Sequence, residues 1–279
     1  MHVLRWILHL TQLTHKVFNP QISLELLMTS AAIGIEVKDV HTLKFDELTE
    51  VTINPPPTYL DELENVLQYI YARAPDITVV LSDNPEPHSS AQSEIIDKCG
   101  IKNPNCSRFI ENLHIPLQSY KVVAVGGTFD HLHAGHKLLL SIAAYAAHEK
   151  VILGITAEEL LLHKKYPDRL ECYEERQNKA IKFIRTLRPN ISVEAYPLHD
   201  MFGPTTAIRD IDALVVSEET GKGGLEVNKQ RLEMNWPELD VLSIKLINGT
   251  SGKLSSTDIR SSLSLNAIEK NNTDKQQSQ

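Results

Sequence analysis

The second half of the chain alternates short apolar runs with helix-like segments, and this alternation limits the fold more than any other feature. The apolar runs predict five strands, at residues 122–125, 151–155, 191–198, 213–217 and 241–247. Helical patterns lie between and after them, at 135–147, 174–187, 205–210, 224–234 and from Ser256 onward. Apolar strands separated by helices form parallel sheets that are covered on both faces. The order therefore predicts an α/β fold: a Rossmann-like, doubly wound, five-stranded parallel sheet.

The first half predicts a smaller α/β domain. A proline-rich turn at 54–58 precedes a segment at 59–75 whose leucines fall on one helical face, and residues 76–83 follow as a buried strand. No chemical motif stands out here, so a role in stability or assembly is expected. We divide the chain into an N-terminal α/β domain at 1–115, a catalytic domain at 116–265 and a disordered polar tail at 266–279.

The charge of the chain is unevenly placed. The formal net charge of −8 argues against nucleic acid or an anionic membrane as the main partner. Residues 1–115 carry 8 Lys and Arg against 15 Asp and Glu, whereas residues 116–279 carry 20 against 21. The second half is therefore the one that can accept an anionic ligand.

The cysteines and the first residues indicate where the protein works. Cys99, Cys106 and Cys172 form no CxxC pair and leave an odd number, which indicates a reducing compartment. The apolar first twenty residues are interrupted by charged and histidine side chains, so they predict no signal peptide, and no run is long enough to span a membrane. We expect a cytoplasmic protein, with the nucleus as a second location.

The junction after the first of the five strands, GGTFDHLHAGH at 126–136, concentrates unusual residues. Gly126 and Gly127 let the backbone turn sharply and approach a ligand. His133 and His136 are three residues apart and share one face of a helix that begins near Ala134. A helix N-terminus offers N–H groups and a positive dipole end. Together with the Thr128 hydroxyl, these groups predict a polyphosphate site.

Three other interpretations of this junction are weaker. A dinucleotide fingerprint would need GxGxxG, which is absent. A zinc site built from His131, His133 and His136 lacks a nearby Cys and any HExxH-type spacing, so we predict no protein-held metal. The histidines could also simply cap the helix, but the whole TFDxLHxGH string exceeds what a cap requires.

This string resembles the T/HxGH signature of the nucleotidyltransferase superfamily, whose second half, an ISSTxIR-like motif, is matched by KLSSTDIRSSL at 253–263. Three segments between them are similar to the archaeal and eukaryotic branch of the phosphopantetheine adenylyltransferases. They are GITAEELLLHKKYPDRLECYEER at 154–176, YPLHDMFGPT at 196–205 and LVVSEETGKGGLEVNKQR at 214–231.

The resemblance implies direct in-line transfer of an adenylyl group from ATP to 4′-phosphopantetheine, with Mg²⁺ accompanying ATP, in coenzyme A biosynthesis. By motif position, His136, Lys165 and His133 would be catalytic. ATP would be bound by Gly126, Thr128, Phe129, His133, Ser255, Ser256, Thr257 and Arg260. Phosphopantetheine would be bound by Thr128, Lys164, Lys165, Met201 and Phe202.

Two departures from the family pattern bear on these expectations. Bacterial members carry an arginine-bearing loop where this chain has SEETGK, so Lys222, Lys229 and Arg231 are candidates for the missing phosphate contact. No GxxxxGK[ST] motif is present, so we expect the dephospho-CoA kinase to be a separate protein and, with other enzymes of the pathway, a partner. The alternatives are a cytidylyltransferase, a nicotinamide-mononucleotide adenylyltransferase, or a scaffold subunit of a coenzyme A-synthesising complex.

Overall fold

The computed structural model describes residues 4–9, 23–28, 36–37, 50–53, 57–81, 108–245 and 255–265. Its larger sheet has six strands, all parallel, in the order β6-β11-β10-β7-β8-β9. The strands are β6 (Phe109–Ile110), β7 (Tyr120–Gly127), β8 (Ala147–Thr156), β9 (Ser192–Leu198), β10 (Ala213–Ser217) and β11 (Asp240–Ile244). The five predicted strands are confirmed, and β6 is a sixth, at the edge. Two residues are too short to produce a sequence pattern, which is why β6 was not predicted.

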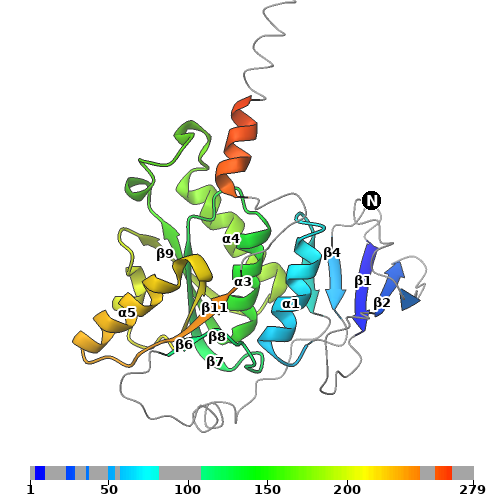
Figure 1. Ribbon diagram of the computed structural model, residues 1–279, viewed down its shortest axis with the longest axis horizontal. Coiled ribbons are helices and arrows are strands. Elements are labelled where there is room, and N and C mark those ends of the chain that lie inside the picture. Colours follow the sequence, from blue (N-terminus) through cyan, green and yellow to red (C-terminus); the bar gives the residue numbers. More distant parts are fainter. Residues whose placement is uncertain are drawn as a thin grey trace, which may run out of the picture.

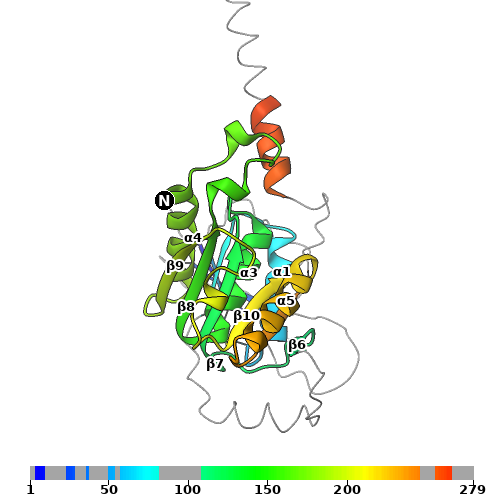
Figure 2. The ribbon, with the colours of Figure 1, turned by 90° about the vertical axis from the view of Figure 1, so that its left-hand side faces the viewer.

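Helices cover both faces of this sheet (Figures 1 and 2), as the doubly wound fold requires. On one face lie α3 (Ala134–Ala146) and α4 (Tyr173–Leu187). On the other lie α5 (Gly221–Glu233) and the 3₁₀ helix η5 (Gly203–Thr206). Alternate residues of β7 point to opposite faces, so Val123 and Val125 pack with α3 while Ala124 packs on the other side.

The helix predicted at 205–210 is wrong: only the short η5 forms there. The guanidinium of Arg231 explains the difference. It donates hydrogen bonds to the carbonyl oxygens of Thr205 (2.6 Å), Ile208 (3.1 Å) and Arg209 (2.7 Å). Those oxygens are the acceptors that a longer helix would use for its own backbone N–H groups.

The strand order places a binding crevice at one point of the sheet. The chain runs outward from β7 through β8 to β9, then returns to build β10 and β11 on the other side of β7. In open α/β sheets, ligands bind beyond the carboxyl ends of the strands where the order reverses. Here that point lies between β7 and β10, and the GGTFDHLHAGH junction leaves the sheet there.

A second, five-stranded sheet has the order β3-β2-β1-β4-β5. Its strands are β1 (Leu4–His9), β2 (Ser23–Met28), β3 (Glu36–Val37), β4 (Glu50–Ile53) and β5 (Thr78–Leu81). The helix α1 (Leu60–Tyr71) lies between β4 and β5 along the chain, so the predicted helix and strand of this region are confirmed. Glu62 starts α1 by accepting hydrogen bonds from the N–H groups of Thr58 (3.0 Å) and Tyr59 (3.3 Å).

The two halves of the chain share one hydrophobic core. Leu63 and Leu67 of α1 are buried in the same cluster as Leu138 of α3 and Val123 of β7. Figures 1 and 2 both show α1 alongside α3. β6 precedes residue 115, the predicted end of the first domain, yet it belongs to the larger sheet. The predicted division stays a prediction, and the tail at 266–279 lies outside the described residues.

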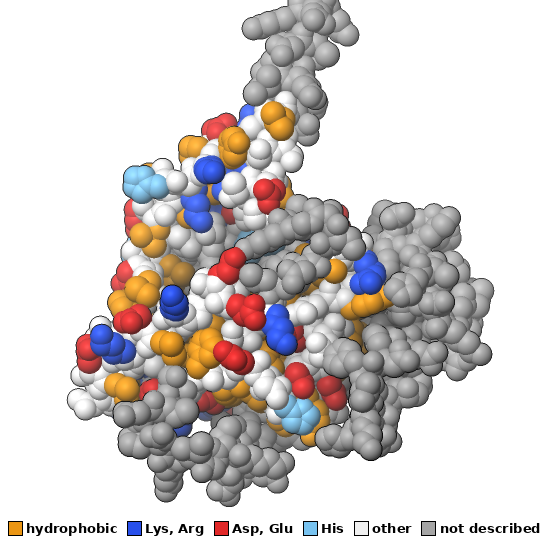
Figure 3. Space-filling view, in the orientation of Figure 1, with side chains coloured by type: hydrophobic (Ala, Val, Ile, Leu, Met, Phe, Trp, Pro, Cys, Tyr) orange, Lys and Arg blue, Asp and Glu red, His pale blue; other side chains and the backbone are white. Residues whose placement is uncertain are grey.

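The outer surface of the described part is mixed in character. On the face shown in Figure 3, acidic, basic and apolar side chains are interspersed. Within the described residues, no helix is both long and apolar enough to cross a membrane.

Candidate active site

The junction between β7 and α3 brings the two signature histidines into contact. His133 is the N-cap of α3, and its Nδ1 accepts a hydrogen bond from the N–H of Gly135 at 3.2 Å. Its ring stacks on that of His136, with centroids 3.9 Å apart and planes at 24°. A Cβ at Gly135 would lie 3.2 Å from the His133 ring, so glycine leaves room for this arrangement. The first turn of α3 contains no acidic side chain, which leaves its positive end available to an anion.

His136 is a neutral imidazole at physiological pH. Burial is the main cause that lowers its pKa well below the usual value, and the neighbouring His133 lowers the pKa further. Its Nδ1 is buried and has no hydrogen-bond partner among the described residues. Phe129 packs against it, with ring centroids 5.3 Å apart. A neutral imidazole keeps one N–H donor, which suits it to hydrogen-bond an anionic oxygen.

The second half of the signature meets the first across the sequence. Asp130, with no exposed surface, forms an ion pair with Arg260, which is 2% exposed. Ser256 donates from its hydroxyl to the backbone oxygen of Asp130 at 2.8 Å. The partners are 126 residues apart in the chain for the Ser256 contact and 130 residues apart for the Arg260 contact. The helix at 256–265, red in Figure 1, is thereby attached at the start of α3.

Arg260 has several partners within the protein, and its expected contact with ATP stays a prediction. Besides Asp130, its guanidinium donates to the backbone oxygen of Lys165 (3.0 Å) and to the Thr257 hydroxyl (3.2 Å). A buried guanidinium with these partners holds three chain segments together.

The three hydroxyls of the SST motif are not equivalent. The Ser255 hydroxyl donates to Asp258 at 2.6 Å, and its N–H binds the same carboxylate at 3.1 Å. These hydrogen bonds, and the charge of His133 to a smaller extent, lower the pKa of Asp258. The Ser256 hydroxyl is used by Asp130. The Thr257 oxygen accepts from Arg260, so its O–H can still donate to a ligand.

The sequence analysis missed two residues that support the junction. Arg176, fully buried in α4, donates to the backbone oxygens of Thr128 (2.8 Å), Thr156 (2.9 Å) and Glu171 (3.0 Å). It therefore fixes the carboxyl ends of β7 and β8 together. One signal could have revealed it: Arg176 lies four residues before Ala180, on the apolar face of α4.

Glu171 is the second residue that was missed. Its carboxylate accepts a hydrogen bond from the N–H of His131 at 2.9 Å, and its own N–H donates to Asp130 at 2.9 Å. The His131 ring lies 2.7 Å from the backbone oxygen of Arg169. His131 is thus held in a structural network beside the stacked pair, with a left-handed φ of 45°.

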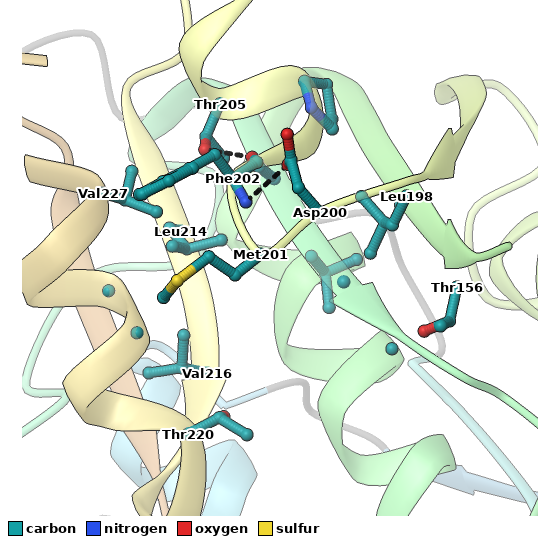
Figure 4. A pocket seen from close by; sticks show the side chains of 18 of the residues that line it. Thr156, Leu198, Asp200, Met201, Phe202, Thr205, Leu214, Val216, Thr220 and Val227 are labelled. Atoms are coloured by element: carbon teal, nitrogen blue, oxygen red, sulfur yellow. Dashed lines mark hydrogen bonds between the residues drawn. The ribbon is translucent and has the colours of Figure 1, made fainter. Parts of the chain in front are cut away.

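A cavity of about 530 Å³ opens beside the junction, on the face covered by α5 and η5. Its floor includes Gly126 and Gly127 of β7, and Figure 4 shows the side chains around it. Asp200 shapes one wall because its carboxylate accepts from the N–H groups of Phe202 (2.9 Å) and Gly203 (2.7 Å). The apolar lining includes Leu160, Leu198, Met201, Phe202, Leu214, Val216 and Val227.

Met201 and Phe202 lie where a ligand in this cavity would contact them. Met201 is 59% exposed and extends toward α5, where a Cβ on Gly223 would lie 4.0 Å from its Cε (Figure 4). Phe202 is half-buried in the same wall. Gly154 completes the floor, since a Cβ there would come within 2.7 Å of Leu198.

The predicted basic residues differ in how accessible they are to a phosphate. Lys164 and Lys165 are exposed, and the backbone of Lys165 is held at the site by Arg260. Lys222 and Lys229 are exposed on α5, and Lys222 lies in its first turn, next to Gly223 of the cavity wall. Arg231 is not available to a phosphate, because it is fully buried and bound to backbone oxygens.

Phe129 belongs to the core as well as to the junction. Its ring is fully buried, lies 5.3 Å from that of His136 between centroids, and would be 3.1 Å from a Cβ on Gly127. Its backbone has a left-handed φ of 51°. The expected contact with ATP stays a prediction.

The fold and this site define a nucleotidyltransferase domain of the cytidylyltransferase-like class, whose family model matches residues 124–262. A phosphopantetheine adenylyltransferase of Pyrococcus furiosus is 42% identical over 147 residues, which cover 52% of this chain and 91% of that protein. One from Thermococcus kodakarensis is 38% identical over 147 residues, covering 52% and 88%. The chain belongs to the phosphopantetheine adenylyltransferase family.

A longer relative is matched only in part. The phosphopantetheine adenylyltransferase of Saccharomyces cerevisiae is 44% identical over 146 residues, which cover 50% of this chain. The match spans about half of the yeast protein, 48% of its length.

Proposed function

We propose that the protein transfers the adenylyl group of ATP to 4′-phosphopantetheine, forming 3′-dephospho-coenzyme A and pyrophosphate. A phosphate oxygen of the acceptor attacks the α-phosphorus of ATP, and the bond between the α-phosphorus and the bridging oxygen breaks, so that pyrophosphate leaves with the electron pair. One observation carries the proposal. The stacked His133–His136 pair at the start of α3 is joined to the helix at 256–265, directly beside an apolar cavity of about 530 Å³.

Positioning and neutralisation of charge can account for this reaction without a covalent intermediate. The N-terminus of α3, His133 and the Thr257 hydroxyl would hold the triphosphate. His136 would donate its N–H to an α-phosphoryl oxygen, where negative charge accumulates as the new bond forms. Mg²⁺ would accompany ATP, whose phosphate oxygens are ligands that this ion favours.

The acceptor would bind next to the triphosphate, on the cavity side of the junction between β7 and α3. Thr128, with Lys165 or Lys164, would bind its phosphate, and Lys222 is a further cation at the cavity edge. The pantetheine arm, a flexible chain in which two amides alternate with short methylene and dimethyl segments, would lie along Met201 and Phe202. These apolar walls favour pantetheine over the nicotinamide riboside or choline of the alternative transferases.

The test is incubation of the full chain with ATP and Mg²⁺ and, in separate reactions, phosphopantetheine, nicotinamide mononucleotide and phosphocholine, scoring pyrophosphate release. Phosphopantetheine should be adenylylated fastest, and CTP should replace ATP poorly. Faster turnover of another acceptor would reject the proposal in favour of that transferase. Pyrophosphate release with none of them would support the scaffold alternative. If phosphopantetheine is the acceptor, the 3′-dephospho-coenzyme A that forms would be phosphorylated by a separate dephospho-CoA kinase.

A further inference from the structure

The helix that carries both signature histidines has a polar stripe on the face toward the first half of the chain. Lys137, Ser141 and Tyr145 recur every four residues, so they lie in one row along α3. All three are buried. Polar side chains in a buried helix face need partners, and the first half of the chain supplies them to Lys137 and Tyr145.

Lys137 directly follows His136 in the sequence, and its side chain extends to residues 75–77 in the first half of the chain. It is 8% exposed, and its ammonium donates to the backbone oxygens of Pro75 (2.8 Å) and Ile77 (3.2 Å). Burial lowers its pKa, and the charge of Asp76 opposes this effect. A buried ammonium is costly unless hydrogen-bonded, so the contact strongly favours one position of α3 relative to the 75–77 turn.

Tyr145 makes the corresponding contact at the other end of the helix. Its hydroxyl accepts a hydrogen bond from the N–H of Leu81 at 3.1 Å and lies 3.4 Å from the backbone oxygen of Leu187. Lys137 and Tyr145 are eight residues apart, about 12 Å along a helix axis. The five residues from Ile77 to Leu81 are four steps of an extended strand, a similar length of about 13 Å. The segment from Pro75 to Leu81 is therefore hydrogen-bonded to α3 at both of its ends.

α1 also contacts the end of β11. Glu64, buried in α1, accepts from the N–H of Lys245 at 2.7 Å and from Gln68 at 2.9 Å. Burial raises the pKa of Glu64, and the N–H and charge of Lys245 oppose it. Lys245 immediately follows β11, and the chain continues from it toward the SST motif at Ser255.

We propose that residues 57–81 set the position of α3 relative to the end of β11, with Lys137 as the positioning residue for the signature histidines and Glu64 for the end of β11. The kinetic part of this inference rests on the proposed function. The first half of the chain would then be part of the catalytic apparatus, although it carries no catalytic motif.

The main test compares Lys137→Met with Lys121→Met in the full chain. Lys121 is an exposed lysine in an ion pair of 3.5 Å with Glu149, so its loss should change little. Lys137→Met should lower kcat roughly ten- to a hundredfold, the effect of a small misplacement of reacting groups, while KM for phosphopantetheine stays within about twofold. Backbone amides at 137–141, which are hydrogen-bonded within α3, should exchange hydrogen faster, measured without substrate.

A Lys137→Met protein that melts at a lower temperature but keeps its kcat and its exchange rates would overturn the proposal, because Lys137 would then only stabilise the fold. Glu64→Leu tests the other contact and should speed amide exchange at 240–245. Glu64→Gln, which keeps an oxygen acceptor for Lys245, should restore slow exchange. If Lys137→Met is insoluble, unchanged exchange in Glu64→Leu rejects the proposal. Faster exchange in a chain inactive on phosphopantetheine rejects only the proposed function.

Discussion

Helix α3 and the helix at 256–265 both begin at the site, but their first turns are stabilised in different ways. The first turn of α3 has no acid, and its N-cap is the imidazole of His133. The other helix is capped by Ser255, and its own Asp258 accepts hydrogen bonds from Ser255. A carboxylate in a first turn already satisfies the positive end of a helix. The comparison supports the proposal that phosphate binds at the N-terminus of α3, with Thr257 of the second helix as a further contact and Arg260 as the attachment between the two helices.

The largest expected effect comes from separating the two helices. Arg260→Met leaves the fully buried carboxylate of Asp130 without its ion-pair partner. Breaking a buried pair typically costs about 3–5 kcal/mol of unfolding free energy. The matched control is Arg108→Met, which removes a partly exposed ion pair of 3.6 Å with Asp240 and should cost less unfolding free energy. Equal losses for the two variants in urea denaturation would contradict the buried role of Arg260.

The next effect concerns the chemistry at α3. His136→Ala should lower kcat by about 10²–10³, the usual loss for one donor to a developing anion, with little change in either KM. His133→Ala should instead raise KM for ATP. The exposed His148 is the control, and His148→Ala should behave like the wild type. A His136→Ala enzyme with normal kcat and a raised KM would make His136 a binding residue.

A smaller effect distinguishes the hydroxyls of the second helix. Thr257→Ala should raise KM for ATP about tenfold, because it removes a hydrogen bond to a charged group. Ser255→Ala should leave this KM nearly unchanged and lower the unfolding free energy by about 1 kcal/mol, because its hydroxyl serves as a cap. Steady-state kinetics and urea denaturation on both variants decide between these roles. A raised KM for ATP in Ser255→Ala together with an unchanged KM in Thr257→Ala would mean that Asp258 releases Ser255 when ATP binds.

The last effect is a pH dependence of stability. His136 has a lowered pKa in the folded protein, so below about pH 6.5 the unfolded chain binds a proton that the native state does not. The contribution of neutral His136 to the unfolding free energy is complete above that pH. It is lost as the pH falls toward the native pKa, by at most about 1.4 kcal/mol per pH unit. Urea denaturation gives the unfolding free energy at each pH from 8 to 5. This free energy should fall less steeply with decreasing pH for His136→Asn than for the wild type. Identical slopes would show that His136 titrates normally.

Local patterns were enough to predict most of the larger sheet. The five strands and the helices α3, α4 and α5 follow from apolar runs and helical periodicity, which depend on each residue and its near neighbours. β6 is too short to have a pattern, and β1 to β4 follow no alternation that was recognised. The helix predicted at 205–210 failed because Arg231, from a different helix, takes its carbonyl oxygens.

The candidate site was predictable in part. The paired signature motifs placed Thr128, His133 and His136 beside the SST helix, and the structure brings these segments together. The uses of individual side chains were less predictable. Arg260 and Arg231 are chemically suited to phosphate, but both are buried and bound within the protein, and the Phe129 ring lies in the core.

The sequence by itself determined the order of the elements, the junction of glycines and histidines and the family, because these depend on residues close together in the chain. Only the tertiary structure decided which polar groups remain for a ligand. Asp130 and Arg260 are 130 residues apart, and Lys137 finds its acceptors 60 and 62 residues away. Such partners are chosen by packing, since a buried charge must be satisfied by whatever the fold places beside it.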